Sequence, residues 1–162
     1  MAILKIVNEN EEIIRKKSKE VKVIDERIIR LLDDMHDTLI KSNGVGLAAV
    51  QVGYLKRIVL VDTGEEILEL INPQIIEAEG KQEELEGCLS CPNKWGFTSR
   101  PEMVTVKALD RNGKPFTKTG YGLTARAFCH ELDHLDGILF SDNAIRMLTQ
   151  DEIKEMLEDD DE

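Results

Sequence analysis

The sequence predicts an α+β domain in which antiparallel strands pack around a helix that bears a pair of histidines. A helix-period segment comes first, short β-branched and alternating segments follow, and helical character returns in the last third of the chain. Helices and strands therefore do not alternate, which disfavours a parallel α/β fold. The 162 residues suit one compact domain, expected at residues 1–150, followed by a short C-terminal helix with an acidic tail at residues 150–162.

The first half of the chain carries one helix signal and two strand signals. Apolar residues recur at helical spacing in Asp25–Ser42, and Asn43-Gly44 supplies a stop. The β-branched run Ile58–Val61 suits a buried strand. A second strand is predicted at Ile67–Ile71, ended by the turn signal Asn72-Pro73.

The second half carries a hairpin signal and two helix signals. Apolar residues alternate with their neighbours over Val104–Ala108, and Arg111–Lys114 contains the Asn-Gly pair of a tight turn. A helix should begin at Thr124 or its neighbours, run through His130 to about Asp136 and be capped by Gly137. The segment Thr149–Glu152 has the form of a capping box, so a last short helix should follow.

The composition disfavours several classes of function. The net charge of −11 argues against nucleic acid as a ligand, because phosphate binding needs clustered Lys and Arg. No stretch approaches the roughly 18 uninterrupted apolar residues of a membrane span, and the N-terminus lacks a secretion signal, so a cytoplasmic location is expected. Three cysteines cannot all pair, and in a reducing compartment cysteine more often binds metal or reacts than forms a structural disulfide.

The strongest chemical signal is the segment His130–His134, which reads His-Glu-Leu-Asp-His. Residues i and i+4 lie on one face of a helix, so two imidazoles can bind one metal ion there. Glu131 can reach a water molecule bound to that metal. Binding to the metal lowers the pKa of this water from about 15.7 to about 7. The alternative is an acidic helix with two surface histidines. Two of only three histidines in the chain fall at this spacing, which favours the metal.

Cys88 is the candidate for the third protein ligand that a hydrolytic metal site usually needs beside an open fourth position. The preceding glycine permits close backbone approach, although a lone cysteine is often only a buried, inert thiol. Cys91 leaves a further possibility, a closed structural zinc site formed by both cysteines and both histidines. The long separation between the two pairs disfavours it.

A third motif, Gly44–Gln51, combines glycines with the side-chain amide of Gln51. The glycines let the backbone approach a ligand, and Gln51 offers a donor for a developing oxyanion. A run of small residues more often reflects close packing, so this segment alone does not decide the function.

Taken in order, the segments Gly44–Gln51, Glu86–Ser90 and His130–His134 resemble the GxGLAAxQ, EGCLS and HExDH signatures of the peptide deformylase family. The resemblance runs from the N-terminus to about residue 150. It implies antiparallel strands packed around a central metal-binding HExxH helix. It also implies an enzyme that removes the N-formyl group from the N-terminal methionine of newly synthesised polypeptides and releases formate.

The resemblance further implies roles for individual residues. Three residues are expected to bind the metal: Cys88, His130 and His134. Glu131 would act as general base and then as general acid, while Gln51 and the backbone N–H of Leu89 would stabilise the oxyanion. The residues expected to contact the substrate are Val45, Gly46, Glu86, Arg100, Leu123, Arg126 and Ala127. Without the resemblance, Arg100 reads equally well as a solvated surface charge.

The expected cofactor is one divalent metal ion, Fe2+ by resemblance, with Zn2+, Ni2+ or Co2+ as replacements. A His2Cys ligand set by itself favours zinc. The expected partners are N-formyl-Met nascent peptides and, transiently, the ribosome, and we expect a monomer that binds neither nucleic acid nor membrane. Some relatives dock on the ribosome through a basic C-terminal helix, whereas an acidic tail would repel ribosomal RNA.

Two other functions fit part of this pattern. A zinc endopeptidase of the HExxH type would share the histidine helix, but its third ligand is typically a downstream histidine or glutamate, unlike Cys88. A non-enzymatic domain with a closed Cys2His2 zinc site would need Cys91 as a ligand. Cys91 and Cys129 also depart from the family pattern, since an aliphatic residue and a glutamine are common at these two places.

Overall fold

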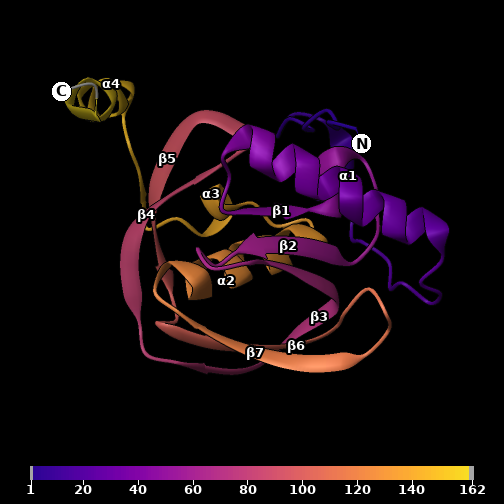
Figure 1. Ribbon diagram of the computed structural model, residues 1–162. Coiled ribbons are helices and arrows are strands. Elements are labelled where there is room, and N and C mark those ends of the chain that lie inside the picture. Colours follow the sequence, from indigo (N-terminus) through magenta and orange to yellow (C-terminus); the bar gives the residue numbers. More distant parts are fainter. Residues whose placement is uncertain (1, 161–162) are drawn as a thin grey trace.

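The computed structural model describes residues 2–160 and has a mixed α and β fold with two antiparallel sheets (Figure 1). One sheet has the strand order β1-β2-β3-β6-β7, formed by Gly46–Ala48, Ile58–Asp62, Ile67–Glu79, Met103–Leu109 and Pro115–Tyr121. The other has the order β4-β5-β8, formed by Gln82–Cys88, Cys91–Arg100 and Arg146–Met147. Within the described residues the named strands pair antiparallel, which confirms the mixed class predicted from the sequence.

The helices are α1 at Glu26–Ser42, α2 at Leu123–Leu135, α3 at Phe140–Asn143 and α4 at Gln150–Asp160, with short 3₁₀ turns η1 at Glu12–Arg15 and η2 at Ala49–Val52. Helices α1 and α2 lie on opposite faces of the larger sheet, while α3 and α4 contact the smaller one. In β2, Ile58 and Leu60 belong to the apolar cluster that includes α1, while Val59 and Val61 belong to the cluster that includes α2. The strand is therefore buried on both faces, which explains its continuous apolar run.

Most of the predicted helix ends are confirmed. Asp25 caps α1 by accepting hydrogen bonds from two backbone N–H groups of the first turn, and Asn43 ends the helix in the left-handed conformation. Before α4, the Glu152 N–H donates to Thr149 Oγ1 at 3.2 Å and the Thr149 N–H donates to Glu152 Oε1 at 3.1 Å. This reciprocal pair is the capping box that the sequence predicts.

The predicted end of the second strand at Asn72-Pro73 is wrong, because β3 continues to Glu79. Asn72 has a φ of 53°, and the register with β6 shifts over residues 71–74. The Asn72 Oδ1 accepts from the Val21 N–H at 2.8 Å, and its Nδ2 donates to the Val21 carbonyl at 2.9 Å. The turn signal therefore produces an irregularity inside the strand, held by the N-terminal segment, and the strand resumes beyond it.

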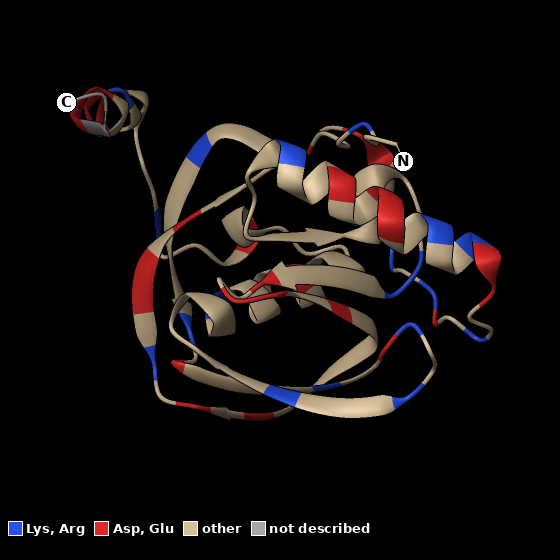
Figure 2. Ribbon diagram, in the orientation of Figure 1, with Lys and Arg blue, Asp and Glu red and all other residues tan. Residues whose placement is uncertain are grey.

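The C-terminal helix α4 extends from the side of the fold that holds β4 and β5 (Figure 1). Ile153 is buried, while acidic positions lie along the rest of the helix (Figure 2). Asp161 and Glu162, the end of the predicted acidic tail, lie outside the described residues. Within residues 2–160, every helix is too short or too polar to cross a bilayer.

We expect Asn72→Ala to destabilise the fold by about 2–3 kcal/mol, because it removes two partly buried hydrogen bonds and places alanine at a positive φ. Urea unfolding followed by circular dichroism measures this change. Asn10→Ala, at an exposed position, is the control and should change the stability by less than about 0.5 kcal/mol. Equal stability of the two variants would contradict the role given to Asn72.

Candidate metal centre and active site

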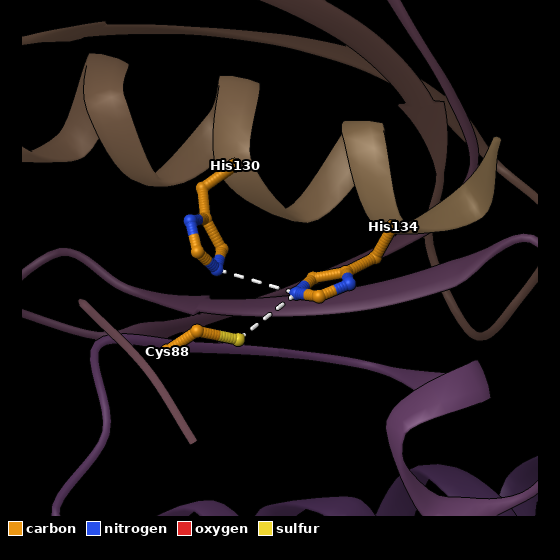
Figure 3. A group of neighbouring side chains, drawn as sticks. All are labelled: Cys88, His130 and His134. Carbon is orange, nitrogen blue, oxygen red and sulfur yellow. Dashed lines mark hydrogen bonds between the residues drawn. The ribbon is translucent and has the colours of Figure 1, made fainter. Parts of the chain in front are cut away.

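Two elements from different parts of the chain bring three metal-ligating side chains together (Figure 3). Cys88 is the last residue of β4, and His130 and His134 lie one turn apart on α2. Cys88 Sγ lies 3.3 Å from His134 Nε2, which lies 3.3 Å from His130 Nε2. All three candidate ligand atoms lie within 4.8 Å of one another.

The geometry of these side chains fits a divalent metal. Two imidazole nitrogens bound tetrahedrally at about 2.0–2.1 Å would be about 3.3 Å apart, as the two Nε2 atoms are here. Burial holds the pKa of His134 well below its ordinary value, so its ring is neutral and can donate a lone pair. Among the residues that the structure describes, Cys91 is not part of this group, so the arrangement does not favour a closed Cys2His2 site.

Glu86 holds His130 from the side opposite the other ligands. The Glu86 Oε2 lies 2.7 Å from His130 Nδ1 and accepts a hydrogen bond from Arg100 Nη2 at 2.8 Å. The Glu86 Oε1 accepts hydrogen bonds from Arg126 Nη1 at 2.8 Å and from Thr98 Oγ1 at 2.9 Å. Burial alone would raise the pKa of Glu86, but His130 and Arg100 lower it far below its ordinary range. The ionised carboxylate therefore accepts a hydrogen bond from the His130 Nδ1–H, which leaves the His130 Nε2 lone pair facing the other two ligands.

The sequence predicts that Glu86, Arg100 and Arg126 contact the substrate, whereas their observed contacts are mostly with one another. Arg126 is 4% exposed and Arg100 is 9% exposed, so neither is a solvated surface charge. Arg100 also donates to Asp133 at 2.8 Å. Glu86 and Arg126 line the cavity beside the metal centre, while Arg100 lies behind it. Sequence reasoning missed this network, because the two arginines that meet Glu86 lie 14 and 40 residues away along the chain.

Glu131 is a buried carboxyl group beside the ligands. It is 4% exposed, and its Oε1 has no hydrogen-bond partner in the structure. Burial raises the pKa of Glu131 to about 7. A carboxyl group with such a pKa can accept and return a proton near neutral pH. Its Oε2 lies so close to Gly46 that a Cβ at that position would be only 2.5 Å away.

Gln51 and Leu89 border the same centre. The Gln51 Oε1 accepts from the Ala48 N–H at 2.9 Å, which turns its amide nitrogen toward Ser90 Oγ at 3.2 Å and Cys88 Sγ at 3.6 Å. Gln51 is 1% exposed, so this orientation is fixed by packing as well as by hydrogen bonds. Leu89 lies in the turn between β4 and β5. The amide donor thus faces the side of the metal centre that the cavity reaches.

A cavity of about 450 Å³ leads to the metal centre. Its wall includes the predicted substrate residues Val45, Gly46, Leu123 and Ala127, together with Trp95, which is half-buried. The outermost strands β1 and β4, each at the edge of its sheet, contribute facing segments of the wall. Edge strands offer free backbone groups, so an extended peptide could bind along them.

Comparisons with known proteins agree on one family. The family model described as polypeptide deformylase matches residues 3–150. The peptide deformylase of Caldicellulosiruptor bescii is 54% identical over 155 residues, covering 96% of this chain and 93% of that protein. A crystal structure of a peptide deformylase from Legionella pneumophila has a TM-score of 0.86 at 40% identity, covering 97% of this chain and 96% of that one. The peptide deformylase from Thermotoga maritima has a TM-score of 0.86 at 33% identity, covering 89% and 99%.

The match spans nearly the whole chain in both sequence and structure. It includes the three motifs that meet at the cavity, at Gly44–Gln51, Glu86–Ser90 and His130–His134. The chain belongs to the peptide deformylase family.

Proposed function

We propose that this chain is a metal-dependent hydrolase that removes the N-formyl group from the N-terminal methionine of newly synthesised polypeptides and releases formate. The observation that carries this proposal is the convergence of Cys88, His130 and His134 beside the buried Glu131 at the end of the cavity. An upstream cysteine as third ligand disfavours a zinc endopeptidase. The position of Cys91 outside the ligand group disfavours a closed structural zinc site.

The chain's own residues provide the acid–base and electrostatic parts of the reaction. A divalent cation held by the three ligands would supply Lewis acidity and lower the pKa of water. Glu131 accepts a proton from the attacking water and later delivers it to the departing amine nitrogen. The Gln51 amide and the Leu89 backbone N–H donate to the oxygen on which negative charge develops, and they act in a buried site where such donors are most effective.

Substrate recognition depends on the cavity wall. The methionine side chain enters the apolar part near Val45, Leu123 and Ala127, and the main chain of Gly46 binds the peptide backbone at the free edge of β1. Glu86 and Arg126 border this space, whereas the ion pairs of Arg100 favour a positioning role through Glu86.

The remaining features of the proposal follow from the family and from the chemistry of the ligands. We propose Fe2+ as the metal in cells, with Zn2+, Ni2+ and Co2+ able to replace it. We further propose that residues 1–150 act as one catalytic domain in a cytoplasmic monomer that meets nascent chains during a transient ribosome contact. The acidic α4 at residues 150–160 disfavours contact of that helix with ribosomal RNA.

Formate release from an N-formyl-Met tripeptide tests the reaction and the role of Glu131. The metal-loaded wild-type chain should release formate under anaerobic conditions. Glu131→Gln and Glu131→Ala should keep one metal ion per chain and lose about 10²–10⁴-fold in kcat, because the ligands remain while the proton carrier is absent. An inactive but metal-loaded wild-type chain would refute the proposed function, and loss of metal from both variants would refute the role of Glu131.

Gly46→Ala tests the close approach between β1 and Glu131. The new Cβ would lie 2.5 Å from Glu131 Oε2 and 2.7 Å from its Cγ, so the carboxyl group must move. We expect kcat to fall about 10²-fold with unchanged metal content, because small displacements of reacting groups are costly. Gly64→Ala, at a φ of 92° with open space around it, is the control for backbone strain and should lower only stability. Equal kcat values for the two variants would argue against this placement.

A further inference from the structure

Two thiols face each other across the hairpin that carries the cysteine ligand. Cys88 and Cys91 are register partners in the antiparallel pair β4 and β5, separated by a two-residue turn. Opposite residues in such a pair have Cα atoms about 4.5–5.5 Å apart and side chains on the same face. Disulfides span Cα distances of about 4.4–6.8 Å, so this pair can be joined without moving the strands.

The surroundings of the two thiols favour reaction with each other. Both are unbridged, and both belong to the wall of the cavity, so a small oxidant can reach them by the route proposed for the substrate. Cys91 is 2% exposed and packs with Val7, Ile14 and Phe140, which shields it from thiols of other molecules. The third cysteine, Cys129, lies outside the cavity wall.

We propose that Cys88 and Cys91 form a reversible disulfide when hydrogen peroxide enters the cavity, and that this bond disables the metal centre. The inference rests on the proposed role of Cys88 as a metal ligand and is independent of the substrate. A sulfur atom within a disulfide carries no thiolate charge, and metal binding by cysteine requires the thiolate. Formation of the bond therefore leaves only the two histidines to hold the ion.

The chemistry balances with peroxide as the only oxidant. Cys88 gives up its proton and the resulting thiolate attacks one peroxide oxygen; an S–O bond forms, the O–O bond breaks, and the released hydroxide takes the proton from Cys88 to become water. The Cys91 sulfur then attacks the Cys88 sulfur, the S–S bond forms and the S–O bond breaks, and the departing hydroxide takes the Cys91 proton. Two thiols are oxidised and one peroxide is reduced to two water molecules.

Cys91 thus acts as a resolving thiol that protects the ligand. In its absence, a sulfenic acid on Cys88 has no partner on the opposite strand and proceeds to the sulfinic and sulfonic acids, which thiol reductants do not reverse. With Cys91 present, reduction returns both thiols and, with them, the metal-binding site.

The test uses the full chain, both zinc-loaded and metal-free, treated with graded hydrogen peroxide. Intact mass, peptide mapping without reduction and zinc content are the readouts. The wild-type chain should lose the mass of two hydrogen atoms, yield a peptide bridged between Cys88 and Cys91, and release close to one zinc per chain. Dithiothreitol should restore zinc binding. Cys129→Ala should behave in the same way.

The Cys91→Val variant should bind zinc before treatment. Cys91→Ser is a second variant in case valine disturbs packing. Under peroxide both should gain oxygen atoms on Cys88 and fail to regain zinc after reduction. The proposal is overturned if the wild-type chain gains oxygen as the variants do, or if the disulfide forms while zinc stays bound. A wild-type chain that forms and reverses the disulfide but releases no formate would uphold this inference and refute the proposed function.

Discussion

The contact between Glu86 and His130 is the interaction on which the candidate metal centre depends. A buried histidine presents its Nε2 lone pair to a metal when its Nδ1–H has a hydrogen-bond acceptor, and Glu86 accepts that bond at 2.7 Å. A buried carboxylate needs compensation in turn, and Arg100 and Arg126 supply it. Removing any one partner would leave an uncompensated buried charge within a few ångströms of the metal ligands.

The fold brings these groups together from both sheets. β4 and β5 provide Glu86, Cys88 and Arg100, while α2 provides Arg126 and the two histidines and packs against the larger sheet. The apolar residues of α2 fix the helix against β2, so its histidine face turns toward the smaller sheet. Packing in the core therefore sets the ligand geometry before any metal binds.

Part of this structure follows from sequence patterns alone, because the signals are local. Asp25 predicts the start of α1, and the four apolar residues of β2 predict a strand buried on both faces. The segment that forms β4 is not predicted as a strand because it contains three glutamates in seven residues, a composition that disfavours a strand. Glu86, one of these three, is buried only because distant arginines meet it, which no local pattern reveals.

The same reasoning explains what could be predicted about the site. The spacing of His130 and His134 indicates a shared metal, because helix geometry alone places them together. The choice between an open site and a closed one depends on where Cys91 points relative to Cys88, which is a matter of strand register and tertiary packing. The orientation of Gln51 likewise depends on hydrogen bonds to Ala48 and Ser90.

X-ray absorption spectroscopy of the zinc-loaded chain tests this account most directly, because it counts sulfur and nitrogen neighbours of the metal. The account predicts one sulfur at about 2.3 Å, two nitrogens at about 2.0 Å and one further light atom from solvent. Two sulfur neighbours, or none, would contradict it, since the fourth position would then be closed by Cys91 or the cysteine would not bind.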